Sequence, residues 1–288
     1  MIQVYDAKQK KLITEDQFGG DFLVFLYNTV MGRLLLKVIF LQPWFWKCTA
    51  VLQKRRSTIG RVNDYIRKYS IVKGKYVDGD WYSFYDFFGR QLKPGAIKFP
   101  ASPLEVIAIA EAKLLVVPIS RDCVVEVKHR TYDLASIVGS SELAAEYEGG
   151  TALIYRLSMH NYHRYLFPDD GAIVSTKRYK GVLHTVSSIA ANYPVYSINQ
   201  RHVSVLDTAH FHTVVMVEVG AMMAGKVVNH PVQSFERGQE KGYFEIGGST
   251  ILVLYKKATI VLNNDITKYS QKGIEVAVDI GESIGKNV

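Results

Sequence analysis

Residues 238–255 read GQEKGYFEIGGSTILVLY and place a long apolar strand pattern directly behind a pair of glycines. The run TILVLY is one of eight short β-branched runs after residue 97, and Gly, Asp and Asn turns separate them. The other seven are VIAIA, LLVVPI, CVVEV, ALIYRL, AIVST, VSVLD and TVVMVEV. This spacing is typical of a compact antiparallel β domain. No βαβ alternation accompanies it, which argues against a dinucleotide-binding sheet.

The first 95 residues have a different pattern. Residues 22–46, FLVFLYNTVMGRLLLKVIFLQPWFW, are the most apolar stretch of the chain, and residues 58–95 read as polar helix. We therefore expect an α+β protein. Residues 1–95 would form a helical, membrane-associating region, and residues 96–288 a β-rich, mostly antiparallel catalytic domain.

Two basic residues interrupt the apolar stretch. Arg33 and Lys37 lie four apart, on one face of a helix, and each costs about 2.5–3.5 kcal/mol at a bilayer centre. A helix lying in the plane of the membrane, with Trp44 and Trp46 at the interface and the basic cluster 54–56 beside it, avoids that cost. A buried helix packed on the catalytic domain is the alternative, and both interpretations stay open.

Composition narrows the class of partner. The chain of 288 residues carries 35 Lys and Arg against 27 Asp and Glu, a net charge of +8 that favours anionic partners. Without zinc-finger spacing or a Gly-rich phosphate loop, an anionic membrane surface is favoured over nucleic acid. Cys48 and Cys123 lie far apart, so we expect no disulfide framework and no metal site. The first 21 residues lack the order of an export signal, which predicts a peripheral protein on the cytoplasmic face of the cell membrane.

The glycine pair gives the chain a possible chemistry. In a strained Gly248–Ser249 bond, the serine hydroxyl can attack the preceding carbonyl, because glycine leaves that carbonyl unshielded. The resulting ester can eliminate, which breaks the chain after Gly248 and converts Ser249 into an N-terminal pyruvoyl group. Gly-Gly-Ser before a strand is by itself more often a turn or a bulge.

Further segments support the chemical interpretation. They are YDFFGRQLKPGAIK at residues 85–98, EVKHRTYDLASIVG at 126–139, NYHR at 161–164, VEVGAMMAG at 217–225 and KGYFEIGGST at 241–250. In this order and spacing the chain resembles the phosphatidylserine decarboxylase proenzymes, particularly the bacterial type whose cleavage motif is Gly-Gly-Ser-Thr. The resemblance extends from about residue 64 to the C-terminus.

The resemblance implies a self-processing lyase of phospholipid biosynthesis. Autocatalytic cleavage between Gly248 and Ser249 would leave a zymogen cut into residues 1–248 and a small chain of 288 − 248 = 40 residues. The pyruvoyl group made from Ser249 would be the cofactor. It would condense with the amine of phosphatidylserine and permit decarboxylation to phosphatidylethanolamine. His163 matches the histidine to which the family assigns protonation of the product, and a homo-oligomer is expected.

Three positions depart from the family pattern. Glu105, in Ser-Pro-Leu-Glu-Val, stands where the usual motif has the aspartate of Ser-Pro-x-Asp-Gly, and we take it as a third catalytic candidate. Leu166 replaces a second histidine that helps to activate the serine, and Asn161 replaces a common aspartate. The relay that activates Ser249 therefore cannot operate in its familiar form. An unprocessed lipid-binding homologue and a decarboxylase of another amine remain as alternatives.

Overall fold

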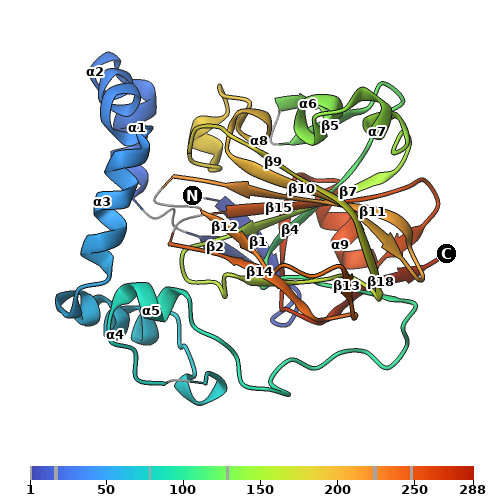
Figure 1. Cartoon of the computed structure of the whole chain (residues 1–288), viewed down its shortest axis with the longest axis horizontal. Helices are drawn as coiled ribbons and strands as arrows, with labels where there is room; N and C mark the ends of the chain where they lie inside the picture. The colour runs from blue at the N-terminus through green and yellow to red at the C-terminus, as the bar shows by residue number, and fades with distance from the viewer. Residues whose placement is uncertain (1, 16–18, 78, 128–129, 223–225, 247–248) are drawn as a thin grey trace.

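The computed structural model describes residues 2–15, 19–77, 79–127, 130–222, 226–246 and 249–288 (Figure 1). It is a mixed α+β structure with mostly antiparallel sheets, which confirms the predicted fold class. Apolar side chains are buried on both faces of the largest sheet, and a third cluster lies under the helices that follow residue 58.

Ten strands form one curved sheet in the order β13-β9-β10-β11-β15-β7-β4-β17-β1-β2. Their bounds are β1 Ile2–Asp6, β2 Lys11–Glu15, β4 Ala112–Pro118, β7 Thr151–Leu157, β9 Gly171–Tyr179, β10 Arg201–Thr208, β11 His212–Gly220, β13 Ser234–Phe235, β15 Ser249–Tyr255 and β17 Glu275–Val278. Three smaller sheets comprise β12 Val227–Asn229, β14 Glu240–Phe244 and β8 Arg164–Leu166; β16 Ile260–Leu262, β18 Ser283–Asn287 and β3 Glu105–Ile107; and β5 Val124–Val127 with β6 Arg130–Asp133.

The strand that begins at Ser249 lies in the middle of the large sheet. β15 pairs in antiparallel fashion with β11 on one side and β7 on the other, and all seven of its residues are buried. Both faces are covered, so the strand is apolar on both, which explains why its sequence does not alternate. The antiparallel ladders fix which residues lie opposite Ser249.

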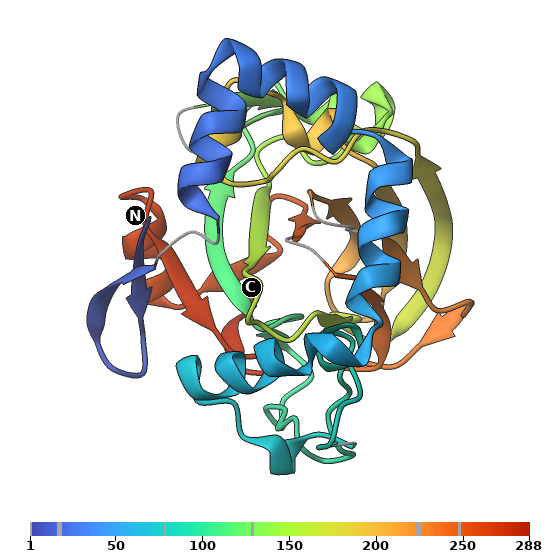
Figure 2. The ribbon, with the colours of Figure 1, turned by 90° about the vertical axis from the view of Figure 1, so that its left-hand side faces the viewer.

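Helices lie around the large sheet, and those of the first 90 residues border one of its ends (Figure 1). They are α1 Gly20–Asn28, α2 Val30–Leu35, α3 Pro43–Gln53, α4 Ile59–Lys68, α5 Phe84–Phe88, α6 Leu134–Val138, α7 Ser141–Ala145, α8 Val195–Ile198 and α9 Asn264–Ser270, with a π-helical stretch at Leu36–Phe40 and short 3₁₀ turns at Arg56–Thr58, Lys73–Lys75 and Ser188–Ala190. Figure 2 looks onto the end that α1 to α4 border. Leu26, Tyr27 and Trp46 join the core, so the apolar region is in part the packed helix that the sequence allowed.

The same region leaves many apolar side chains in solvent. Within the described residues, no single helix is both long and apolar enough to cross a bilayer. α1 and the following stretch to Phe40 reach that length and composition only as a pair bent by 92°. That these helices face a membrane stays a prediction, as does the division of the chain at residue 95.

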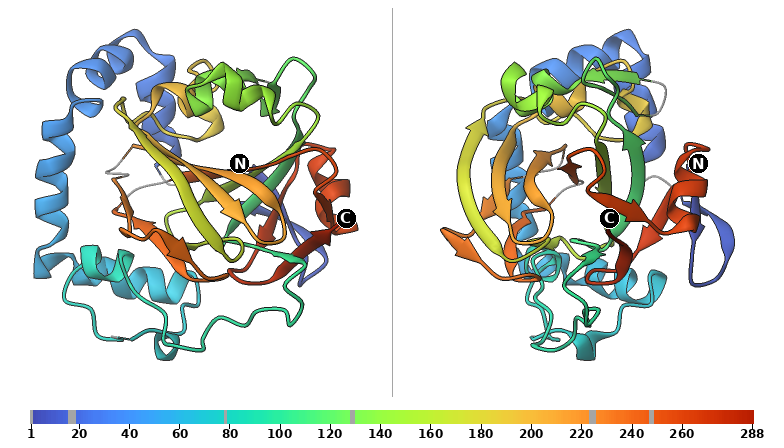
Figure 3. Two further views of the ribbon diagram at one scale, coloured as in Figure 1. Left: turned by 45° about the vertical axis from the view of Figure 1, so that its right-hand side comes forward. Right: turned by 90° about the vertical axis from the view of Figure 1, so that its right-hand side faces the viewer.

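The beginning of the chain differs from the expected helical region. β1 and β2 form a hairpin in the large sheet, and β1 pairs in parallel with β17 from the other end of the chain. Figure 3 shows the dark blue hairpin beside the red C-terminal elements. The hairpin was missed because its polar, mixed-charge sequence carries little strand pattern, and its partner lies some 270 residues away in the chain.

Candidate active site

Ser249 is the first residue of β15. It lies opposite Gly220 of β11 and Leu157 of β7, and it is fully buried. Its hydroxyl oxygen has no hydrogen-bond partner in the part of the chain that the structure describes. A buried hydroxyl without a partner is unfavourable by about 1–3 kcal/mol, so its persistence calls for an explanation. Gly247 and Gly248, which complete the predicted cleavage motif, lie outside the described residues.

His163 follows the turn that leaves β7 and precedes β8. Its Nδ1 lies 2.8 Å from the main-chain oxygen of Asn161, and its ring centroid lies 3.9 Å from that of Phe88. A carbonyl oxygen can only accept, so Nδ1 carries the hydrogen. Nε2 is buried, and within the described residues it has no partner. Burial, helped by the charge of Arg90, lowers the pKa of His163 to about 3, so the ring is neutral at pH 7 with a free lone pair on Nε2.

The Asn161 side chain holds the turn on which His163 depends. Its Oδ1 accepts from the main-chain N–H of Ser158 at 2.9 Å and from Nζ of Lys113 at 3.0 Å. Its Nδ2 donates to Oε1 of Glu111 at 2.7 Å. An aspartate has no N–H for Glu111 and would place two carboxylates in contact. The replacement of the family's common aspartate by Asn161 is thus explained by Glu111.

Glu105 and Leu166 lie in different surroundings. Glu105 is in β3 opposite Lys286, and its main-chain oxygen accepts from Arg237 at 2.9 Å. Leu166 is buried in β8, and its N–H donates to the main-chain oxygen of Ile109. A leucine side chain there can pack but cannot relay a proton. The catalytic role of Glu105 stays a prediction.

Among the described residues, two carboxylates reach the NYHR segment: Glu240 pairs with Arg164, and Glu111 accepts from the Asn161 side chain on which the His163 turn depends. The sequence analysis missed Glu111 because the Ser-Pro motif directed attention to residues 102–106. The available signal was the acidic residue in the apolar run IAEAKLLVV, which becomes β4. An acidic residue beside a buried strand commonly marks a functional position.

A second unforeseen group is a buried ion pair on the Ser249 face of the sheet. Nζ of Lys241 lies 2.7 Å from Oε1 of Glu218, and both side chains are at most 2 % exposed. Glu218 is opposite Ile251, so by the period of two it projects from the same face as Ser249, one step diagonal to it. Asn229 Nδ2 lies 3.3 Å from the other oxygen of Glu218. Glu218 is therefore a carboxylate on the same face as Ser249 and diagonal to it, without a hydrogen bond to the serine hydroxyl.

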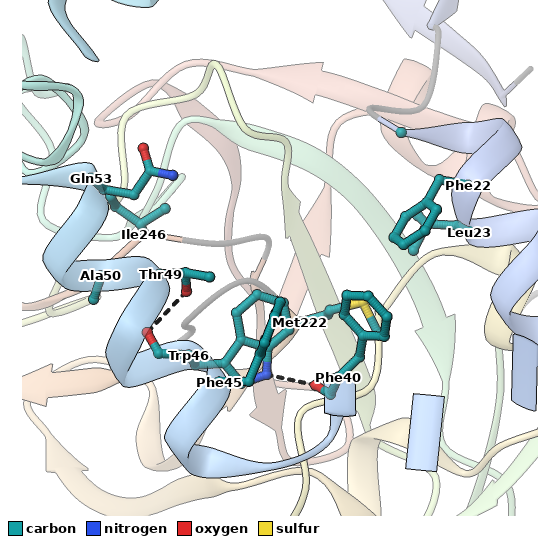
Figure 4. A pocket seen from close by; sticks show the side chains of 11 residues that line it. Phe22, Leu23, Phe40, Phe45, Trp46, Thr49, Ala50, Gln53, Met222 and Ile246 are labelled. Carbon is teal, nitrogen blue, oxygen red and sulfur yellow. Dashed lines mark hydrogen bonds between the residues drawn. The ribbon is translucent and has the colours of Figure 1, made fainter. Parts of the chain in front are cut away.

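An apolar pocket of about 230 Å³ adjoins this end of β11 and β15 (Figure 4). Met222 follows Gly220 by two residues, and Ile246 precedes Ser249 by three. The helices supply the rest of its lining, which is Gly19, Phe22, Leu23, Phe40, Phe45, Trp46, Thr49, Ala50 and Gln53. In Figure 4 the rings of Phe40, Phe45 and Trp46 gather around Met222. The pocket joins the apolar helices to the segments beside Ser249.

A more polar pocket of about 480 Å³ shares Ile246 with it. Phe88, whose ring contacts that of His163 at a tilt of 35°, lines this pocket together with Arg90 and Arg164. Its acidic members are Asp80, Asp86 and Glu245. Polar and apolar spaces thus meet at the segment that leads into β15, an arrangement that suits an amphipathic molecule.

Comparison with known proteins defines the class of this site. Residues 84–286 match the family model described as phosphatidylserine decarboxylase, so the protein is a decarboxylase, a carboxy-lyase. It is 38 % identical over 286 residues to phosphatidylserine decarboxylase proenzyme 2 of Clostridium acetobutylicum, covering 99 % of this chain and 98 % of that one. It is 32 % identical over 292 residues to the proenzymes of Ruminiclostridium cellulolyticum and Chlamydia pneumoniae, covering 99 % of this chain and 97 % of each relative. The chain belongs to the phosphatidylserine decarboxylase family.

The pKa of His163 predicts an acid-sensitive fold. The unfolded ring takes up a proton near pH 6.5, whereas the buried ring stays neutral down to about pH 3. The unfolded state thus binds more protons in this window, and stability is lost as the pH falls from 6.5 toward 3. Replacing His163 with Gln should reduce the slope of unfolding free energy against pH by about 1.4 kcal/mol per unit.

Urea unfolding at several pH values between 4 and 7, in the single-chain Ser249→Ala background, measures this slope. The control is His212→Asn at an exposed histidine, which should keep the parental slope. Equal slopes for the two variants would show that His163 takes up a proton in the folded state.

Proposed function

We propose that this protein converts phosphatidylserine to phosphatidylethanolamine with a pyruvoyl group made from its own Ser249. The observation that carries the proposal is the buried, unpartnered hydroxyl of Ser249 at the start of a central strand, directly behind Gly-Gly. The names of the relatives supply the substrate. Self-cleavage at Gly248–Ser249 would generate the group from the zymogen.

The surroundings of Ser249 fit such a group. Gly220, opposite Ser249, has no side chain to fill the space, and burial excludes water. The pyruvoyl group supplies an electrophilic carbonyl that holds the substrate amine and draws off the electrons left when carbon dioxide departs. Because His163 is neutral, its Nε2 would first accept a proton from the substrate ammonium as the amine binds and would then donate it to the product carbon. Its low pKa makes the protonated ring a ready donor.

For self-cleavage, we infer that Glu218 takes the proton of the Ser249 hydroxyl. As the O–H bond breaks, the oxygen bonds to the carbonyl carbon of residue 248. The peptide nitrogen takes the proton back from Glu218 and leaves as an amine. The α-proton of Ser249 then passes to the departing carboxylate of residue 248 as the Cβ–O bond breaks, which leaves a dehydroalanine. The imine tautomer of this group adds one water and releases ammonia, and the pyruvoyl carbonyl remains. Lys241 holds the Glu218 carboxylate in place.

Replacing Ser249 with Ala should abolish both cleavage and decarboxylation, because no hydroxyl remains to attack. Intact mass under denaturing conditions would show a single full-length chain in this variant and two fragments in the parent. Thr250→Val removes the neighbouring buried hydroxyl and should still be cut. A parent protein that stays full length yet decarboxylates without an added cofactor would refute the proposal. A full-length, inactive parent would favour the unprocessed lipid-binding homologue.

Replacing Glu218 with Gln should slow cleavage by roughly 10² to 10⁴, the range for loss of a general base. Lys241 would then be buried without its partner, so the double variant Glu218→Gln with Lys241→Met separates chemistry from stability. Both variants should be cut slowly in time courses of fragment appearance, whereas His163→Gln should be cut at nearly the parental rate. Slow cleavage in His163→Gln with normal cleavage in the double variant would assign the base to His163.

We also propose that α1 to α3 rest on the cytoplasmic face of the cell membrane. Large apolar side chains stay exposed along them, namely Phe22, Val24, Phe25, Val30, Met31, Leu34, Val38, Trp44, Val51 and Leu52. Such a concentration of exposed apolar side chains marks an interaction surface, and a lipid bilayer suits its amphipathic helices. Acyl chains could then enter the apolar pocket from the bilayer, with the head group toward Ser249. Whether the enzyme forms a homo-oligomer stays a prediction.

Binding to vesicles that contain phosphatidylserine should weaken with salt, because the basic cluster 54–56 contributes about 1 kcal/mol per charge near anionic lipid. Replacing Lys54, Arg55 and Arg56 with Gln should reduce partitioning by roughly 10²-fold. The matched control, Lys257, Lys268 and Lys272 to Gln, removes three exposed charges away from these helices. Equal losses for both triple variants in a vesicle sedimentation assay would argue against a specific basic surface.

A further inference from the structure

We propose that the N-terminal hairpin is part of the catalytic machinery, with Glu15 acting through Lys113 as a positioning residue for His163. The inference rests on the proposed role of His163. It concerns β2, which lies outside residues 84–286, the segment that the family model matches.

Glu15, the last residue of β2, reaches into the protein rather than toward solvent. Its side chain is 14 % exposed, with Oε1 3.1 Å from Nζ of Lys113 and Oε2 2.8 Å from Nη2 of Arg156. The hydroxyl of Ser158 donates to Oε1 at 2.8 Å. Burial alone raises the pKa of Glu15, but the charges of Lys113 and Arg156 with these hydrogen bonds bring it down to about 2. Glu15 is therefore an anion at neutral pH.

From Glu15 the contacts lead to the turn that carries His163. Lys113 donates to Oδ1 of Asn161 at 3.0 Å, and the main-chain oxygen of Asn161 accepts from Nδ1 of His163 at 2.8 Å. That last hydrogen bond places the hydrogen on Nδ1 and leaves Nε2 free. Glu15 also contacts this turn directly, because its carboxylate accepts a hydrogen bond from the hydroxyl of Ser158. The orientation and tautomer of His163 thus depend on a carboxylate from the start of the chain.

The neighbouring arginine is less dependent on Glu15. Arg156 also pairs with Glu275, to which its Nε and Nη2 both donate. Among the described residues, Lys113 forms an ion pair with Glu15. Loss of the Glu15 charge would therefore leave the buried Lys113 with the uncharged Oδ1 of Asn161 and Nε2 of His160, 3.0 and 3.1 Å from its Nζ, and the turn would shift.

The test compares Glu15→Gln, Lys113→Met and the double variant with the parent, with decarboxylation of phosphatidylserine in mixed micelles normalised to the cleaved fraction. We expect kcat to fall on the order of 10²-fold in all three, as for a misplacement of about 1 Å, with KM little changed. Removing both members of a buried pair should restore the melting temperature that either single change lowers. Glu146→Gln, which breaks the exposed pair with Lys256, is the matched control and should keep parental kinetics.

The tautomer of His163 gives a readout that does not require activity. ¹⁵N spectra of histidine-labelled protein, assigned with His163→Gln, should show protonated Nδ1 in the parent and a mixture of tautomers in the double variant. A double variant that regains stability, the parental tautomer and kcat together would overturn the inference. If the tautomer changes as expected in the double variant but the parent protein has no decarboxylase activity, the positioning role is upheld and the proposed function is refuted.

Discussion

The structure depends on the pairing of β15 between β11 and β7. This central strand is buried over its whole length, yet its first residue is the one proposed to react. The two antiparallel ladders fix its register, because a slip by one residue would turn every side chain to the opposite face. The same register places Gly220 and Leu157 directly opposite Ser249. It places Glu218 one step diagonal to Ser249. Leu157 ends β7 and begins the turn to His163, so one pairing positions both ends of the site.

Two buried sets of charges lie on opposite faces of this sheet. Glu218 shares a face with Ser249, whereas Arg156 is opposite Thr250, the next residue, and projects to the other face. Removing one member of such a pair is far more destabilising than removing both, so each set imposes a defined geometry on its neighbours. Burial keeps His163 neutral, and the buried hydroxyl of Ser249 has no partner among the described residues. The site thus combines rigid charged supports with unpaired reactive atoms.

Sequence reasoning could predict much of this arrangement. The short β-branched runs, together with the helical pattern before them, predicted the α+β class. The motifs GGST and NYHR singled out Ser249 and His163. Ser249 begins β15 and His163 ends the turn after β7, so both residues lie at the same end of the sheet. The hairpin and Glu15 could not be found, because their partners are distant in sequence and no local pattern reports such pairing. Glu111 was passed over for Glu105 because matching a motif by residue type ignores which carboxylate the chain folds toward Asn161.

The departures from the family pattern become consistent once the contacts are considered together. With Glu111 and Lys113 both reaching one side chain, position 161 needs an acceptor for the ammonium and a donor for the carboxylate, and an amide is the group that offers both. With Leu166 packed in the core, no imidazole can assist from β8, so the proposed proton transfers would fall to His163 and Glu218. In the proposed self-cleavage, the base would be the Glu218 carboxylate, which a buried lysine holds on the same face of the sheet as Ser249. A self-cleavage that each molecule would perform once could tolerate such a base, whereas the proposed repeated decarboxylation would require the well-positioned His163.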